Sequence, residues 1–312
     1  MSRKLITIST IMTLMSTSVI ADVPNVAADI APIHSLVSRV MDGVGAPKLI
    51  VQSGASPHGY RLRPSEAKAL QDADHVFWMG EELTPWLDSA IDTLATKASV
   101  TTLLDQEGII LHDFRDSALF EAHDHSAHGD DDHDDHDDHD DHGSHDPHAW
   151  LSPENAKLWL NIIASKLSVS DPENAATYFM NAAAGQAEIE AMIAEVKATL
   201  KPVQGGKFVV FHDAYQYFEN DFDFYASGAI SLGDSSDPSP ARIEKVQKRI
   251  RDEGIQCVLA EPQFKKGLVA TVMEGSDATA SVIDPLGTEL EAGPKLYTQL
   301  IKNMAKTLRN CL

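Results

Sequence analysis

Short apolar runs alternate with longer amphipathic stretches along most of the chain, and this order predicts an α/β fold. Apolar runs typical of buried strands occupy 47–51, 75–79, 100–104, 208–211, 257–260 and 280–283. Apolar residues at helical spacing occupy 64–71, 83–96, 172–200, 241–253 and 294–308. Residues 148–151 are expected to be extended, and Ser152 followed by Pro153 is a typical start of a further helix.

The predicted helix at 172–200 is longer than an average helix of a globular protein. It would span about 40 Å at 1.5 Å per residue, and it separates two α/β halves. We therefore expect one long rigid helix that joins two lobes. The predicted domains are an N-terminal lobe at 22–170, a linking helix at 171–201 and a C-terminal lobe at 202–312.

The first 21 residues are typical of a secretory signal peptide, which is removed during export. Arg3 and Lys4 precede an apolar core at 5–15, and cleavage is expected after Ala21. The core is too short for a stable membrane span, and no cysteine near the cleavage site offers a lipid anchor. We expect an exported protein without a membrane anchor, located in a bacterial periplasm.

Residues 121–148, here named the His/Asp-rich segment, contain nine of the fourteen histidines and twelve acidic residues, but no Lys or Arg. Such a composition has little to bury, so a disordered loop is expected at 121–145. Imidazole is a good ligand for zinc, copper and nickel, and carboxylates add oxygen ligands. A solvated acidic linker is the alternative, although histidine at every third position is unusual for one. The candidate auxiliary metal ligands are His123, His125, His128, His133, His136, His139, His142 and His145.

The net charge of −22 argues against nucleic acid as a partner and favours a cationic ligand. The only two cysteines are Cys257 and Cys311. In an oxidising compartment an isolated pair predicts one structural disulfide. A cysteine metal site is the weaker alternative, because neither residue lies in a close-spaced motif.

Three histidines outside the repetitive part of the chain lie at or near the ends of predicted strands. His58 follows the first strand, His148 lies in an Asp-Pro-His turn, and His212 directly follows the strand at 208–211. In open α/β sheets, ligands bind beyond the carboxyl ends of the strands. Three neutral imidazoles form a good zinc shell with one position left over, and Asp284 or a water molecule is expected to fill it.

Each of these residues also has an ordinary structural interpretation. A single histidine after a strand is often a hydrogen-bonding residue, and His34, His75 and His112 are interpreted as structural or surface residues. Glu261, after its strand, is expected either to hold a histidine ring or to pack between the lobes. Asp213 is expected to hold a ring in the same way or to cap the next helix.

Six short segments resemble one known family in their order and spacing. They are the segments at 54–65 (GASPHGYRLRPS), 73–80 (ADHVFWMG), 146–153 (DPHAWLSP), 211–215 (FHDAY), 260–264 (AEPQF) and 283–287 (IDPLG). Together they cover nearly all of the chain after the signal peptide. The chain resembles the zinc-binding component of bacterial high-affinity zinc ABC importers, the ZnuA type of the metal-binding solute-receptor family.

This resemblance implies two α/β lobes with mostly parallel sheets, joined by one long rigid helix, with a metal ion in the cleft between the lobes. It implies His58, His148 and His212 as metal ligands, and delivery of the metal to an inner-membrane ABC permease with a cytoplasmic ATPase. Some relatives have a glutamate directly before the first ligand, where this chain has Pro57. The fourth ligand is therefore expected to be Asp284 or solvent. Manganese-binding relatives use two histidines and two carboxylates, so the third histidine favours zinc.

The expected function is capture of Zn²⁺ as a transported ligand by a monomeric receptor, with the His/Asp-rich segment as a weaker zinc store. A manganese or iron receptor of the same fold and a stand-alone periplasmic zinc buffer are the alternatives. A zinc hydrolase is less consistent with the sequence: three histidines and a water are also a catalytic shell, but the chain has no HExxH motif. We therefore expect that the protein is not an enzyme.

Overall fold

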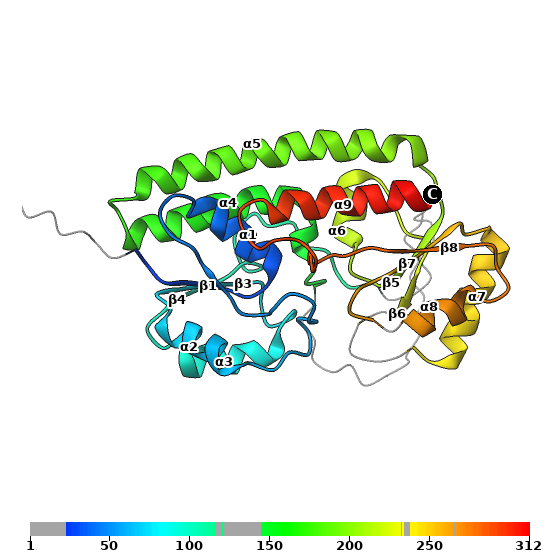
Figure 1. Cartoon of the computed structure of the whole chain (residues 1–312), viewed down its shortest axis with the longest axis horizontal. Helices are drawn as coiled ribbons and strands as arrows, with labels where there is room; N and C mark the ends of the chain where they lie inside the picture. The colour runs from blue at the N-terminus through cyan, green and yellow to red at the C-terminus, as the bar shows by residue number, and fades with distance from the viewer. Residues whose placement is uncertain (1–22, 116–119, 121–144, 232, 234–237, 265) are drawn as a thin grey trace, which may run out of the picture.

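The computed structural model describes residues 23–115, 120, 145–231, 233, 238–264 and 266–312. The expected signal peptide and most of the His/Asp-rich segment lie outside these described residues. The described part of the chain forms two α/β lobes side by side, with long helices along one side of both (Figure 1). The predicted α/β class is confirmed.

The N-terminal lobe is built on a parallel sheet whose two faces are both covered. Its strands are β1 (Val26–Ala28), β2 (Lys48–Leu49), β3 (His75–Trp78) and β4 (Ser99–Thr102). They are arranged in the order β2-β1-β3-β4. Phe77 packs into a central core, whereas its neighbours Val76 and Trp78 pack on the opposite face. Burial on both faces explains why the sequence of β3 is apolar throughout its centre instead of alternating with polar residues.

Three helices cover this sheet. They are α1 (Ala31–Val40), on the side of the long helices, and α2 (Pro64–Asp72) and α3 (Pro85–Leu94), on the opposite face (Figure 1). Both α2 and α3 begin with a proline, whose fixed φ suits the first position of a helix.

The C-terminal lobe repeats this arrangement. Its strands are β5 (Phe208–His212), β6 (Ala229–Ser231), β7 (Cys257–Ala260) and β8 (Thr279–Val282). They are parallel, in the order β6-β5-β7-β8. Its helices are α6 (Gln216–Phe222), which faces the central core, and α7 (Pro240–Glu253) and α8 (Lys266–Met273), which cover the outer face. The Ser239 side chain accepts a hydrogen bond from the Arg242 amide and so caps α7.

Three long helices connect the lobes: α4 (Pro153–Ser170), α5 (Ala175–Leu200), which continues into the short helix η2 (Lys201–Val203), and α9 (Leu296–Cys311). Figure 1 shows α5 passing over both lobes. The start of α9 is fastened to α1, because Ser35 Oγ donates to Gly293 O at 2.7 Å and accepts from the Tyr297 amide at 3.0 Å. One hydrophobic core runs through α1, α4, α5, α9 and the inner faces of both sheets, so the long rigid connection expected from the sequence is present.

Two local predictions are corrected by the structure. Residues 149–151 form a short 3-10 helix, η1 (Ala149–Leu151), where an extended segment was expected. This turn allows Ser152 to cap α4, since the Ser152 side chain accepts a hydrogen bond from the Asn155 amide. The helix expected from 172 begins at Ala175, because Asn174 donates to the Asp171 carboxylate in a turn before it, and Tyr178 in the first turn of the helix donates to the same carboxylate.

The predicted disulfide is present. Cys257 and Cys311 are bonded, with their Cα atoms 5.6 Å apart, and the bond joins β7 to the last turn of α9. Among the described residues, no helix combines the length and the apolar character needed to cross a membrane.

Candidate metal centre

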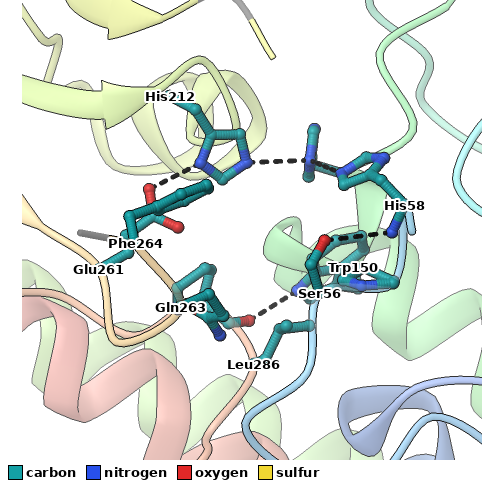
Figure 2. Close-up of a pocket in the computed structure, with 11 residues that line it drawn as sticks. Ser56, His58, Trp150, His212, Glu261, Gln263, Phe264 and Leu286 are labelled. Atoms are coloured by element: carbon teal, nitrogen blue, oxygen red, sulfur yellow. Dashed lines mark hydrogen bonds and ion pairs between the residues drawn. The ribbon is translucent and has the colours of Figure 1, made fainter. Parts of the chain in front are cut away.

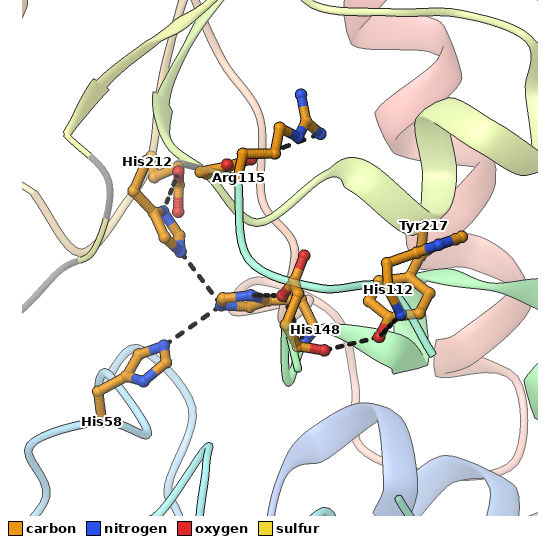
Figure 3. A network of polar contacts seen from close by, with 9 residues as sticks. His58, His112, Arg115, His148, His212 and Tyr217 are labelled. Carbon is orange, nitrogen blue, oxygen red and sulfur yellow. Dashed lines mark hydrogen bonds and ion pairs between the residues drawn. The ribbon is translucent and has the colours of Figure 1, made fainter. Parts of the chain in front are cut away.

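His58, His148 and His212 meet between the two lobes, although they are far apart in the sequence. Each offers a ring nitrogen, and these three atoms lie within 4.8 Å of one another. The Nε2 atom of His148 is 3.3 Å from His58 Nε2 and 3.4 Å from His212 Nε2. Figure 3 shows the three rings pointing toward a common centre, with His148 in the middle.

These separations fit one ion in a tetrahedral shell. Zinc binds imidazole nitrogens at about 2.0–2.1 Å, so two nitrogens of an ideal tetrahedron lie about 3.3 Å apart. Imidazole nitrogens that converge at this distance repel one another through their lone pairs unless a cation or a proton lies between them. The geometry of the three rings therefore suits a divalent metal ion.

Two buried carboxylates fix the orientation of two of the rings. Asp146 Oδ1 is 2.6 Å from His148 Nδ1, and Glu261 Oε1 is 2.7 Å from His212 Nδ1. Because each carboxylate can accept the Nδ1–H proton, the Nε2 atom carries the lone pair toward the centre. Burial raises the pKa of Asp146 to about 6, which still leaves the carboxylate as its major form at pH 7.5.

The topology of the C-terminal sheet explains why His212 and Glu261 are neighbours. His212 is the last residue of β5, and Glu261 directly follows β7. The strands β5 and β7 are adjacent and parallel, and the connections from them leave in opposite directions along the sheet. This switch point is where open α/β sheets bind ligands. The predicted role of Glu261 in holding a histidine ring is confirmed by this contact.

The loop that carries His58 is fixed from behind by residues of the N-terminal lobe. The Trp86 indole N–H donates to Pro57 O at 2.6 Å. The Tyr60 hydroxyl donates to Glu66 at 2.8 Å, and the Tyr60 and Trp86 rings lie 5.6 Å apart. These contacts hold the backbone on both sides of His58, which is itself only half buried.

The cavity at the three rings has a volume of about 20 Å³, close to the space that one water molecule needs. Its apolar lining comes from both lobes and includes Pro57, Trp150, Phe264 and Leu286 (Figure 2). Phe264 stacks on Phe211 with ring centroids 4.1 Å apart, so this wall is packed against β5. The cavity has room for a metal ion with one small additional ligand.

Asp284, the candidate fourth ligand, does not belong to the group of converging ligand atoms among the described residues. Its carboxylate accepts hydrogen bonds from the amides of Leu286, Gly287 and Thr288, at 3.0, 3.0 and 2.5 Å. The carboxylate therefore stabilises the turn after β8, and this turn supplies Leu286 to the cavity wall.

The other candidate residues have different roles or lie elsewhere. Of the eight candidate auxiliary ligands, only His145 is among the described residues, and its Nε2 atom lies 3.6 Å from Asp113. Asp213 forms an ion pair with Arg115 at 3.4 Å, a role that differs from both alternatives expected for it. Burial lowers the pKa of the remaining described histidines, which are His34, His75 and His112.

The sequence reasoning missed two residues that position the converging histidines, Asp146 and Trp86. Asp146 was detectable, because an acidic residue two positions before a histidine in a tight turn can reach that histidine ring. No sequence signal relates Trp86 to Pro57, because the two residues are 29 positions apart and meet only through the packing of α3.

The fold and the site together define a two-lobed protein with a candidate metal site of three histidines between its lobes. Residues 26–311 match the family described as "ZnuA: Zinc-uptake complex component A periplasmic". The chain therefore belongs to the ZnuA family.

Relatives with high similarity are named ZnuA as well. The High-affinity zinc uptake system protein ZnuA of Brucella abortus (strain 2308) is 46% identical over 304 residues, which cover 92% of this chain and 91% of the relative. The protein of the same name from Paracoccus denitrificans is 41% identical, with 94% of this chain and 93% of the relative covered.

Solved structures support the fold. A crystal structure of ZnuA superposes with a TM-score of 0.75 at 20% identity, covering 93% of this chain and 99% of that one. The binding protein FpvC from Pseudomonas aeruginosa, solved in complex with Mn²⁺, superposes with a TM-score of 0.73 at 18% identity, covering 92% of this chain and 97% of that one.

Proposed function

We propose that this protein captures Zn²⁺ in the periplasm and delivers it to an ABC-type permease with a cytoplasmic ATPase. The observation that carries the proposal is the convergence of the Nε2 atoms of His58, His148 and His212, at separations of 3.3 and 3.4 Å. The family description and the names of the relatives support zinc as the transported ion. In this proposal the protein is exported by its signal peptide, has no membrane anchor and acts as a monomer.

The fourth zinc ligand in this proposal is a water molecule. Asp284, the other candidate, already accepts three backbone hydrogen bonds, and turning it toward the histidines would cost those bonds. The small cavity supports a receptor over a hydrolase, because an ion and one water leave little space for a substrate. Three imidazoles without a carboxylate in the shell also favour zinc over manganese, which prefers oxygen ligands.

Zinc affinity is expected to fall as the pH decreases, because protons compete with zinc for the imidazole nitrogens. Histidine side chains in model peptides have a pKa near 6.5, so competition from protons increases as the pH falls from 7.5 to 5. We expect the apparent affinity to be at least about tenfold weaker at pH 5 than at pH 7.5. Competition titration with a chelator at each pH measures this, and an unchanged affinity would argue against a site made of three imidazoles.

The His/Asp-rich segment is proposed to be a second, weaker zinc store. Replacing residues 122–144 by a short Gly/Ser linker is expected to lower the zinc stoichiometry and to leave the tight site unchanged, since none of the three converging histidines is removed. A matched control keeps the length and replaces the seven histidines from His123 to His142 by glutamine. Isothermal calorimetry counts both classes of site, and loss of the tight site in either variant contradicts the two-site proposal.

Growth under zinc limitation tests the transport function. A strain that lacks this gene is expected to grow poorly in chelated medium and to recover when zinc is added. Recovery with manganese or iron instead would favour a receptor for those ions. Normal zinc uptake by the deletion strain would indicate a periplasmic buffer that does not serve a permease.

A further inference from the structure

The segment that leads into the His/Asp-rich segment crosses from the N-terminal lobe to the C-terminal lobe. The His112 amide donates to the Tyr217 hydroxyl oxygen at 3.1 Å, and this hydroxyl donates to Asp146 O at 2.7 Å. The Asp146 amide in turn donates to His112 O at 2.8 Å. His112, before the His/Asp-rich segment, and Asp146, near its end, are therefore paired with each other and attached to Tyr217 on α6.

Arg115 extends this attachment into a buried acidic group of the C-terminal lobe. Its Nη2 atom is 2.8 Å from Glu219 Oε2 and 3.4 Å from Asp213 Oδ1. The exposed fractions of these side chains are 14% for Arg115, 2% for Glu219 and 7% for Asp213. A residue that belongs in sequence to the N-terminal lobe thus balances buried negative charge in the other lobe.

Contacts around Phe120 hold the guanidinium in place. The Arg115 guanidinium carbon lies 3.8 Å from the centre of the Phe120 ring, which is a cation–π distance. Phe120 O accepts a hydrogen bond at 3.0 Å from Arg249, on α7. The chain on the far side of Arg115 is therefore also attached to the C-terminal lobe.

The acidic group lies directly behind a metal-binding histidine. Asp213 follows His212 in the sequence, and Figure 3 shows Arg115 on the same side of His148 as His212. A second arginine, Arg242, acts on Asp213 through its charge, but its hydrogen bonds go to the carbonyls of Ile230 and Ala229. Without Arg115, two buried carboxylates beside the end of β5 would lose their close cation and would have to move toward solvent.

We propose that Arg115 is a positioning residue for the metal centre. By balancing Asp213 and Glu219, it keeps the end of β5 and the His212 ring in place, and it attaches the residues before the His/Asp-rich segment to the C-terminal lobe. This inference rests on the proposed zinc-binding function.

Zinc titration of Arg115→Met, beside the wild-type protein, tests the inference. Methionine keeps much of the length of the side chain without its charge. Removing groups that orient metal ligands typically weakens metal binding 10–100-fold, and we expect a loss in this range. Hydrogen exchange is also expected to become faster in 109–115 and 216–222. Arg251→Met is the matched control, because Arg251 is an exposed arginine on α7. The zinc affinity of this variant should equal that of the wild type.

A charge rescue separates positioning from general stability. Adding Glu219→Gln to Arg115→Met removes one unbalanced carboxylate and keeps its shape, so part of the lost affinity should return. If the single variant does not fold, the double variant is compared with the wild type, and a weaker affinity is expected. A folded Arg115 variant with wild-type zinc affinity overturns the inference. Weak zinc binding by the wild-type protein would instead refute the proposed function on which the inference rests.

Discussion

His212→Ala is expected to lose the tight zinc site. The substitution removes one of three converging nitrogens and leaves Glu261 as a buried carboxylate without its imidazole partner. Loss of an outer hydrogen-bond partner of a metal ligand already costs about 10–100-fold in affinity, so loss of the ligand itself should cost at least about 100-fold. Calorimetric titration of metal-stripped protein with zinc measures the change in affinity. A competing chelator is added where zinc binds too tightly for direct titration.

His75→Ala is the matched control for this experiment. His75 is also a buried strand histidine with one close side-chain partner, since its Nε2 atom lies 2.7 Å from Ser170 Oγ. The control reproduces the loss of a buried ring but leaves His58, His148 and His212 intact. It should therefore lower the stability of the protein without changing its zinc affinity. If His212→Ala still binds zinc as tightly as the wild type, the His/Asp-rich segment is the real binding centre.

The sequence was sufficient to find the three histidines because each has a local signal. His212 ends an apolar strand, His148 lies in a recognisable turn, and His58 follows the edge strand of the first sheet. The carboxyl ends of parallel strands meet at one edge of a sheet, so His58 and His212 can be grouped without coordinates. His148 was also expected near the end of a strand, but it directly precedes the short helix η1 instead. Glu261 also follows a strand, and of the two roles expected for it, holding a histidine ring is the one that the structure shows.

The direction of a side chain could not be predicted in the same way. Asp284 also follows a strand, yet its carboxylate accepts backbone hydrogen bonds from its own turn. Short acidic side chains often bond to the amides two or three residues later, and this competes with binding a ligand. The ion pair of Arg115 with Glu219 could not be predicted from the sequence either, because it links positions 104 residues apart in different lobes.

Short elements were harder to predict than long ones. The three-residue strands β1 and β6 were missed, because their few apolar residues give no clear period, and the helices α1, α6 and α8 were missed as well. The long helix α5 was found with its end correct and its start three residues early. These errors leave the predicted arrangement of two lobes intact, since that arrangement depends on α5 and on the strands β3, β5 and β7.

The second large effect is expected on stability, from loss of the disulfide. Cys257 and Cys311 are separated by 54 residues, and the bond closes most of the C-terminal half of its lobe into one loop. Restricting a loop of this length in the unfolded chain stabilises a protein by about 4 kcal/mol. For a chain of this size, the loss should lower the melting temperature by roughly 10 °C. Denaturant unfolding of the metal-free Cys257→Ala, Cys311→Ala double variant measures the free energy.

Zinc affinity should change far less than stability in this variant. Cys257 begins β7 and Glu261 follows its other end, so the whole length of the strand separates the disulfide from the histidine that Glu261 holds. Chemical reduction of the wild-type protein is the matched control, because it breaks the bond without altering the packing of a buried cysteine. An unfolding midpoint that reduction does not shift would show that α9 is held by its apolar contacts alone. A loss of zinc affinity as large as that of His212→Ala would show that the disulfide also positions the metal centre.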